Sequence, residues 1–438
     1  MFFGRGLFDV IFSKRRGLIP TARAVMALGL ILSLSLAMVA GCAGKPVQNQ
    51  GQPNQQQGTP AASKEPVKIG GLYILTGSLA LYGKAGSQGL QMAKDEINQA
   101  GGILGRQVEL QVADEQGKPD VATREAKRLV LDWKADALIG VDSSGSVLAV
   151  ADAMKELQRP LLVTHAATPK LVMENWNKYV FRVTNDARMD AWAAAMLAAK
   201  MPYKRWANIG QDYEFGRVSW SDFFKKLKEL KPDVENVGEA WPKLGASDFT
   251  NHITALLNAK PEAVFSTVWG GDLVTFIKQA KGFGFFDQVK QFVDPVGASL
   301  SVLVPLGKDA PEGMLVSARY WFLYPDTERN HKFVAAYHQR FNEYPDYVAH
   351  EGYSALYMYK AAVEKAGSTD PEKVVAALEG LSYDSPQGTK VIRAQDHQVF
   401  KDLVWGYTKH TDKYPFAILD RLTVIPQKDV TYPPGNKR

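Results

Sequence analysis

The sequence predicts an α/β protein with two doubly wound lobes. Short runs of β-branched and aromatic residues alternate with amphipathic stretches of helical period, a rhythm typical of βαβ units. The alternation begins near residue 67 and restarts near residue 179, and the chain from 67 to 438 is long enough for two lobes. Such lobes are expected to bind a ligand between the carboxyl ends of their strands.

The first lobe is expected to contain alternating strands and helices. The expected strands cover 67–74, 108–112, 137–141 and 161–164, and the expected helices cover 88–100, 121–133 and 147–157. The pair Gly101-Gly102 ends the first of these helices, because glycine readily adopts the left-handed backbone found just past a helix.

The second lobe is expected to repeat this pattern. The expected strands cover 179–183, 206–210, 237–241 and 263–269, with helices over 187–200, 219–230 and 249–259. Two long helices follow over about 329–341 and 350–365, and residues 390–425 have strand character.

The N-terminus has the layout of a secretory signal over 1–41. A basic stretch precedes an apolar run from Ala24 to Ala40, and Val39-Ala40-Gly41-Cys42 resembles the bacterial lipobox, in which the cysteine is acylated. Cys42 is the only cysteine. The alternatives are an uncleaved membrane anchor, for which the run is short, and twin-arginine export, suggested by Arg15-Arg16. Residues 42–66, rich in Gln, Asn, Pro, Gly and Ser, predict a lipidated cysteine and a flexible linker.

Composition argues against several classes of function. The net charge of +6 falls to +2 without residues 1–41, since 47 basic and 45 acidic residues remain, and no basic run interleaved with aromatics suggests nucleic-acid binding. A phosphate loop, a serine-hydrolase elbow and a zinc-binding His motif are absent from the sequence. We therefore predict no catalytic residues, no metal and no cofactor.

An ordered set of motifs links the chain to a known family. These are Ile69-Gly70, Leu75-Thr76-Gly77, Tyr82-Gly83-Lys84, INQAGGILGR at 97–106, Ile139-Gly140, Ser143-Ser144-Gly145, Ala166-Ala167-Thr168-Pro169, Tyr179-Val180-Phe181-Arg182, Pro311-Glu312-Gly313 and Asp396-His397-Gln398. The set resembles the branched-chain amino-acid-type solute-binding proteins of ABC importers, which have the type I periplasmic binding fold. The resemblance covers nearly all of the chain after the linker.

The resemblance implies an organisation and partners. It places the first lobe at 67–184 plus 319–390 and the second at 185–318 plus 391–438, with crossings near Thr184, Ala318 and Lys390. It implies a monomeric, lipid-anchored, extracytoplasmic protein, in the periplasm or on the outer face of the cell membrane. Its partners would be a small solute, an ABC permease and, through the permease, its ATPase subunits.

The resemblance also implies ligand contacts. Hydroxyls and amides at Ser144, Ala166, Ala167 and Thr168 would hold a carboxylate, although Ser144 and Thr168 are also ordinary helix caps. Asp294, or alternatively Asp272, would hold an ammonium group. Tyr82, Tyr213, Phe215 and Trp269 would form cleft walls, with packing as the alternative role. Phe215 stands where the family usually has Tyr, and His165 lies close to the expected pocket.

The expected function is capture of an amino acid, branched-chain or a similar small carboxylate, for a permease. Two alternatives remain open: a sensor built on the same fold, and an importer component for urea, an amide or an aromatic acid. An enzyme on this scaffold is a third class, for which the sequence offers no nucleophile or metal motif.

Overall fold

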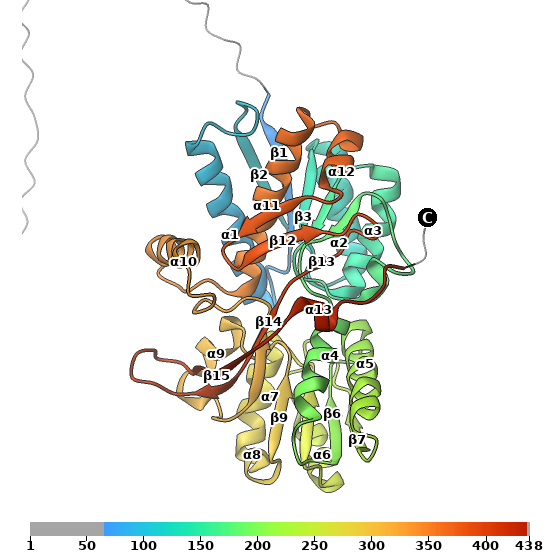
Figure 1. Cartoon of the computed structure of the whole chain (residues 1–438), viewed down its shortest axis with the longest axis vertical. Helices are drawn as coiled ribbons and strands as arrows, with labels where there is room; N and C mark the ends of the chain where they lie inside the picture. The colour runs from blue at the N-terminus through green and yellow to red at the C-terminus, as the bar shows by residue number, and fades with distance from the viewer. Residues whose placement is uncertain (1–64, 436–438) are drawn as a thin grey trace, which may run out of the picture. The chain divides into compact units, whose positions relative to one another are not determined.

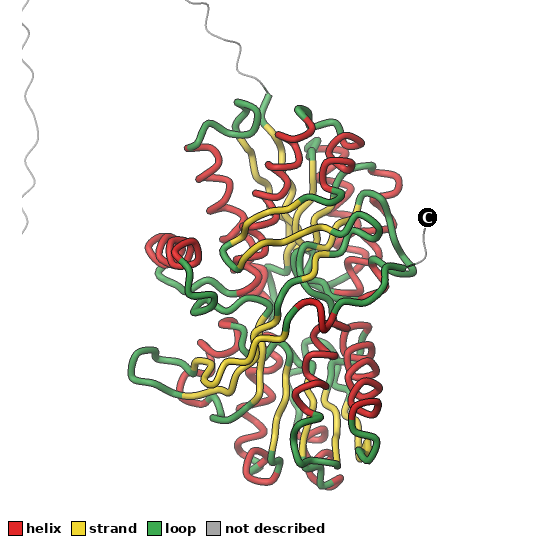
Figure 2. Tube along the Cα trace, viewed as in Figure 1, coloured by secondary structure: helices red, strands yellow, loops and turns green. Residues whose placement is uncertain are grey.

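The structure is a computed structural model that describes residues 65–435. The predicted signal sequence, Cys42 and most of the predicted linker lie outside the described residues. Two large sheets with flanking helices, and a third small sheet, make up the described part (Figures 1 and 2). The predicted α/β architecture is confirmed.

The first sheet is entirely parallel and follows the strand order β2-β1-β3-β4-β5. Its strands are β1 (Val67–Tyr73), β2 (Val108–Asp114), β3 (Ala137–Gly140), β4 (Leu161–Val163) and β5 (Val180–Arg182). The order reverses between β1 and β3, which is a topological switch point.

The second sheet repeats this order and adds an antiparallel edge. It runs β15-β14-β10-β9-β8-β6-β7, and its parallel part reverses between β6 and β8. Its strands are β6 (Arg205–Ile209), β7 (Glu235–Ala240), β8 (Ala263–Ser266), β9 (Gln291–Asp294), β10 (Leu315–Ala318), β14 (Leu403–Lys409) and β15 (Ile418–Ile425). A third, small antiparallel sheet contains β11 (Ser382–Ser385), β12 (Gly388–Ile392) and β13 (Val399–Phe400).

The helices connect and cover these strands. They are α1 (Ala80–Gln99), α2 (Pro119–Lys127), α3 (Ser144–Leu157), α4 (Ala187–Ala198), α5 (Glu214–Leu230), α6 (Thr250–Ala259), α7 (Gly270–Gly282), α8 (Phe285–Gln288), α9 (Leu300–Leu306), α10 (Glu328–Phe341), α11 (Tyr347–Ala366), α12 (Pro371–Leu378) and α13 (Gln427–Val430). A π-helical turn (Arg128–Asp132) continues α2, and short 3-10 turns cover Pro169–Leu171 and Gly307–Asp309.

Helix α1 begins eight residues earlier than the sequence pattern predicts. Its first half carries Gly83, Gly86 and Gly89, residues that lower helix propensity. A Cβ at Gly83 would lie 1.9 Å from the Ile74 carbonyl oxygen, and one at Gly89 would lie 1.9 Å from that of Ala349. The glycines therefore allow α1 to pack closely against β1 and α11, which lies beside it in Figure 1.

The chain passes three times between the two large sheets. It leaves the first sheet after β5, returns after β10 through α11, and reaches the second sheet again between β13 and β14. Hydrophobic side chains form clusters around each sheet. The lobe boundaries at 184, 318 and 390 remain predictions.

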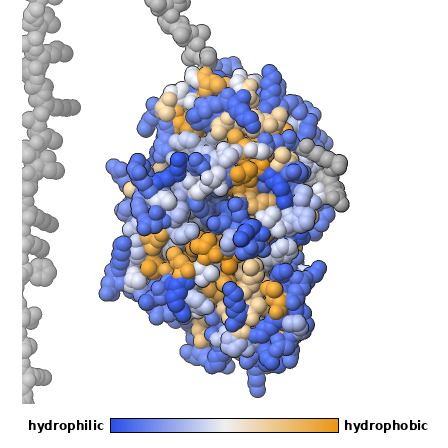
Figure 3. Space-filling view, viewed as in Figure 1, coloured by the Kyte–Doolittle hydropathy of each residue, from blue (hydrophilic) through white to orange (hydrophobic). Residues whose placement is uncertain are grey.

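Among residues 65–435, no helix combines the length and apolar character needed to cross a membrane. In the face shown in Figure 3, hydrophilic residues dominate, and hydrophobic residues gather toward the middle.

Candidate ligand-binding site

A small cavity lies where the switch points of the two large sheets meet. Loops after β3 and β4 supply one side of it, and loops after β6, β8 and β9 supply the other. Its lining residues are Asp142, Ser144, His165, Ala167, Tyr213, Phe215, Trp269, Val296, Arg319 and Tyr347. The carboxyl ends of parallel strands are the usual ligand sites of such folds, because helix N-termini and loop side chains converge there.

Asp142 ties the β1 and β3 ends of the first switch point together. Its Oδ2 accepts a hydrogen bond from the Ile74 amide at 2.6 Å, and its own amide donates to Glu115 Oε1 at 2.6 Å. Val141 before it has a φ of 65°, a left-handed backbone that is uncommon for a β-branched residue. This turn places the Asp142 carboxyl in the cavity wall ahead of α3.

Burial raises the pKa of both carboxyl groups in this pair. Glu115 and Asp142 are fully buried, and desolvation disfavours the charged form of each. The Asp142 carboxyl further raises the pKa of Glu115, and Asp114 does the same to Asp142. Within residues 65–435, no Lys or Arg forms an ion pair with either carboxyl, and the one basic partner is His165.

His165 links Asp142 to α11. Its Nδ1 lies 3.0 Å from Asp142 Oδ1, and its Nε2 lies 2.7 Å from the hydroxyl of Tyr347. Burial, together with the Arg319 charge, holds the pKa of His165 well below its usual value, so the imidazole is neutral. Because a carboxylate only accepts and a tyrosine can donate, we assign the proton to Nδ1.

Aromatic rings surround His165. Tyr82 stacks on it with ring centroids 5.1 Å apart, and Trp269 and Tyr347 meet it edge-on at 5.2 and 5.4 Å. The Trp269 indole also donates a hydrogen bond to the Tyr213 hydroxyl at 3.0 Å. These contacts give the cavity rigid walls of mixed apolar and polar character.

Arg319 enters the cavity from the residue after β10 and is already paired. Its Nε and Nη2 donate to Asp190 Oδ2 at 3.0 and 2.9 Å, and its Nη1 donates to the His165 carbonyl at 2.7 Å. The side chains of Arg319 and Asp190 are each 2% exposed. The guanidinium therefore brings little net charge to the cavity.

Hydrogen bonds across the rim hold the two sides together. Ser78, after β1, donates to Asp272 of α7 at 2.7 Å, and Thr168 donates to Glu214 of α5 at 3.0 Å. The cavity between them measures only about 10 Å³, at the lower limit for one water molecule. The cavity must therefore widen before it can hold a solute larger than water.

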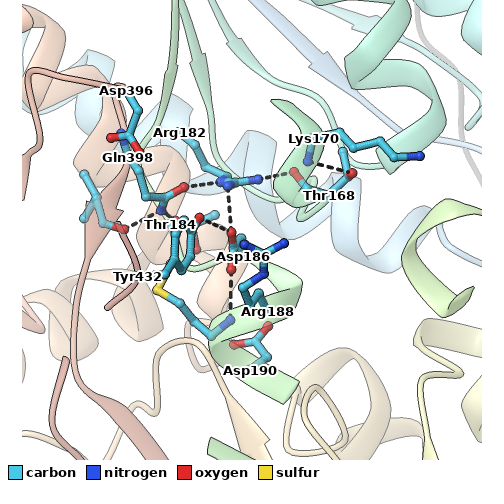
Figure 4. Close-up of polar contacts among 12 residues, drawn as sticks. Thr168, Lys170, Arg182, Thr184, Asp186, Arg188, Asp190, Asp396, Gln398 and Tyr432 are labelled. Carbon is cyan, nitrogen blue, oxygen red and sulfur yellow. Dashed lines mark hydrogen bonds and ion pairs between the residues drawn. The ribbon is translucent and has the colours of Figure 1, made fainter. Parts of the chain in front are cut away.

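A second buried network joins the chain crossings. Arg182 donates to Gln398 Oε1 at 2.6 Å, to the Thr168 carbonyl at 2.5 Å and to Asp186 at 3.0 Å (Figure 4). Tyr432 donates to the same Asp186 carboxylate. This network lies outside the set of residues that line the cavity.

The predicted ligand residues divide into two groups. Five of them line the cavity: Ser144, Ala167, Tyr213, Phe215 and Trp269. Five do not: Tyr82, Ala166, Thr168, Asp272 and Asp294. All ten remain predictions as ligand contacts.

Each residue outside the lining makes protein contacts. Tyr82 packs on His165 and Trp269, and the Ala166 amide donates to the Val141 carbonyl. Thr168 accepts from the Lys170 amide, as an N-cap does. Asp272 accepts from Ser78, from Gln211 and from the Gly245 amide. Asp294 is buried beside Val296, whose amide donates to its Oδ1.

Asp142, Arg319, Tyr347 and Val296 line the cavity without having been identified from the sequence. Asp142 could have been predicted from the sequence, because an acidic residue at the end of a strand, just before Ser143-Ser144, indicates a polar binding site. Arg319 follows β10. Its contact with His165, 154 residues away in the chain, is visible only in the folded structure. Tyr347 is the first residue of α11. It lies 182 residues from His165 in the chain, so the sequence does not indicate that the two side chains are in contact.

Within the described residues, no group of His, Cys, Asp and Glu side chains could hold a metal ion.

Comparisons with known proteins place this chain in a family. The model of the periplasmic binding protein family matches residues 66–409. A leucine-, isoleucine-, valine-, threonine- and alanine-binding protein of Pseudomonas aeruginosa is 26% identical over 328 residues, which are 74% of this chain and 84% of that protein.

Solved structures agree with this assignment. An ABC-type branched-chain amino acid transporter from Rhodopseudomonas palustris superposes with a TM-score of 0.67 at 28% identity, covering 85% of this chain and all of that one. A solute-binding protein of an ABC transporter from the same species, in complex with 3,4-dihydroxybenzoic acid, has a TM-score of 0.75 at 24% identity over 82% and 98% of the two chains, which establishes the fold alone. From the matched residues and the shared two-sheet architecture, this chain belongs to the periplasmic binding protein family.

Proposed function

We propose that this protein captures a small amino acid, branched-chain or similar, and presents it to the membrane permease of an ABC importer. The observation that carries the proposal is the cavity at the two switch points, which combines apolar walls with a few converging polar groups. The names of the relatives reported above support an amino acid as the solute.

The residues that line the cavity suit both the carboxylate and the hydrocarbon side chain of an amino acid. Ser144 stands in the first turn of α3, where unpaired amides and the helix dipole favour a carboxylate. Phe215, Trp269 and Val296 offer an apolar surface for a hydrocarbon side chain. Burying one leucine-sized side chain contributes about 1.5–3 kcal/mol, enough to prefer aliphatic over small polar solutes.

Capture depends on closure between the lobes. The cavity takes residues from both sheets, so a solute inside it contacts both lobes and stabilises the closed arrangement over the open one. The rim bonds of Ser78 and Thr168 form only on closure in this account. The permease would then recognise the closed form.

A second candidate ligand is an aromatic acid. Five of the ten lining residues carry rings, namely His165, Tyr213, Phe215, Trp269 and Tyr347, and flat walls accommodate a flat ligand. An amino acid and an aromatic acid differ in the ammonium group, which makes the two ligands separable by experiment.

We also propose that Cys42 anchors the protein to the outer face of a membrane. The support is the signal-like segment that ends in Val39-Ala40-Gly41-Cys42. Metabolic labelling with a radioactive fatty acid should label the wild type and leave Cys42→Ala unlabelled. Equal labelling of both would exclude Cys42 as the lipidation site.

The test of solute capture is a thermal-shift panel on the purified full-length protein. It compares L-leucine, L-valine, urea, benzoate and 3,4-dihydroxybenzoate. A ligand at about 100 times its dissociation constant stabilises a protein by about 2.7 kcal/mol, a visible rise in melting temperature. A rise with the branched-chain amino acids supports the proposal, and a rise with benzoates alone would transfer it to aromatic acids.

A further inference from the structure

The charges around the cavity are not evenly matched. Arg319 is paired with Asp190 through two of its nitrogens. Asp142 and Glu115 form the other ionisable group, and no Lys or Arg of the described part pairs with either. A buried carboxylate without a cation is costly, since desolvation removes the water that would stabilise its charge.

The two carboxyl groups also retain unused hydrogen-bonding capacity. Asp142 accepts from the Ile74 amide on one oxygen and from His165 on the other, whereas an ionised carboxylate has about four acceptor positions. Glu115 Oε2 is buried and has no hydrogen-bond partner. Asp142 can therefore accept a further donor from a ligand in the cavity that it lines, and Glu115 lies behind it.

Resting on the proposed function, we infer that Asp142, supported by Glu115 behind it, binds the ammonium group of the solute. The solute class is then zwitterionic α-amino acids. Ser144, the first residue of α3, follows Asp142 by two residues in the sequence and lines the same cavity. An α-amino acid carries its ammonium and carboxylate on one carbon, so acceptor and donor groups this close in the chain match its two ends.

The aromatic residues of the cavity wall are also consistent with a bound ammonium group. Trp269, Tyr213 and Tyr347 line the cavity together with Asp142. A desolvated ammonium group is attracted to the face of such a ring. The rings and the carboxylate would thus favour the same charged group.

The other two acids near the cleft are less suited to this role. Asp272 is occupied by Ser78, Gln211 and the Gly245 amide, with distances of 2.7 Å each. Asp294 has a free Oδ2, but its carboxyl lies outside the cavity lining. Asp142 combines a carboxyl group that lacks a Lys or Arg partner in the described residues with a place in the cavity wall.

This assignment predicts selectivity as well as affinity. A carboxylic acid without an amino group would bring a negative charge toward Asp142 and no donor for it. Like charges at short range repel, so such acids should bind far more weakly than amino acids of the same size.

The test measures binding of L-leucine and of 4-methylpentanoate, its analogue without the amino group, by titration calorimetry on the full-length protein. The wild type should prefer L-leucine, and Asp142→Asn should bind it about 10- to 150-fold more weakly, the range for losing a hydrogen bond to a charged group. The same substitution should leave 4-methylpentanoate unchanged or improve its binding.

The control is Asp152→Asn on the exposed face of α3, whose side chain is 61% exposed and which should bind L-leucine like the wild type. Circular dichroism and urea unfolding of Asp142→Asn identify any folding defect, and retained 4-methylpentanoate binding would show an intact cavity. Equal affinity of the wild type for both compounds, or a loss in Asp294→Asn instead of Asp142→Asn, would overturn the inference and leave solute capture standing. Binding of neither compound to the wild type would overturn both.

Discussion

Buried carboxyl groups at the chain crossings differ from those at the cavity. At the crossings, Asp186 contacts Arg182 (Figure 4), and Glu351 of α11 accepts from both Lys390 and Lys401. At the cavity, Asp142 and Glu115 have no Lys or Arg partner within the described residues. All four acidic side chains belong to fully or almost fully buried residues.

The paired carboxyl groups at the crossings suit a structural role, and the carboxyl groups without a Lys or Arg partner at the cavity suit a role in ligand binding. Burial opposes ionisation of Glu351, but Lys390 and Lys401 outweigh it and hold its pKa well below the usual range. Burial and the neighbouring acid instead raise the pKa of Asp142 and Glu115. At the crossings, buried carboxylates are ionised beside their own cations, whereas the cavity holds carboxyl groups that ionise readily only when a cation such as an ammonium group lies beside them.

The largest effect is expected at the crossings. Glu351→Ala would leave two ammonium groups buried without their carboxylate. Removing one partner of a buried ion pair typically costs about 3–5 kcal/mol, and urea unfolding should show a loss of this size. The loss should occur with or without L-leucine, because Glu351 lies outside the cavity lining.

The matched control is Glu364→Ala on the same helix. Glu364 is 42% exposed and pairs with Lys360, so its removal should change the free energy of unfolding by no more than about 0.5 kcal/mol. Equal losses in the two variants would mean that the charges at the crossings are not a special source of stability.

A smaller effect is expected at the rim. Ser78→Ala removes the hydrogen bond to Asp272 and leaves that carboxylate two other donors. A lost hydrogen bond of about 1 kcal/mol corresponds to about fivefold weaker binding of L-leucine, measured by calorimetry. Ser87→Ala, which removes a hydroxyl bonded within α1, should leave affinity unchanged. Unchanged affinity in Ser78→Ala as well would show that this contact does not favour the closed form.

Most of the fold could be predicted from the sequence. The alternation of strand and helix patterns predicted β1 to β4 of the first sheet and β6 to β8 of the second, because buried parallel strands are short apolar runs bounded by loops. It assigned 179–183 to the second lobe, whereas β5 pairs with β4 in the first sheet. It did not predict β9 and β10. The start of α1 was missed, since Gly83 and Gly89 read as breakers in a single chain. Glycine is required at these two positions because the carbonyl groups of Ile74 and Ala349 lie too close to α1 to leave room for a side chain.

The site was predicted only in part, for a similar reason. Loops that follow strands carry most of the residues that line the cavity, and the family resemblance predicts five of the lining residues: Ser144, Ala167, Tyr213, Phe215 and Trp269. The charges were harder to place. Whether Asp142, Asp272 or Asp294 is free to bind a cation depends on its hydrogen-bond partners. Gln211, a partner of Asp272, lies 61 residues away in the chain. A local sequence pattern cannot predict such partners.

Proton release on ligand binding tests the central claim most directly. In the free protein, the raised pKa of Asp142 and Glu115 keeps this pair partly protonated near neutral pH, with Asp114 and His165 as its ionisable neighbours. An ammonium group beside Asp142 favours the ionised form and lowers the pKa, so binding should expel a proton. Affinity should therefore rise with pH through the range of the raised pKa.

The measurement is calorimetric titration of L-leucine in two buffers with different ionisation enthalpies. The account predicts release of up to one proton per bound L-leucine in the wild type at about pH 7, and none in Asp142→Asn. Binding of L-leucine without proton release, or with the same release in Asp142→Asn, would contradict the assignment of Asp142 as the partner of the ammonium group.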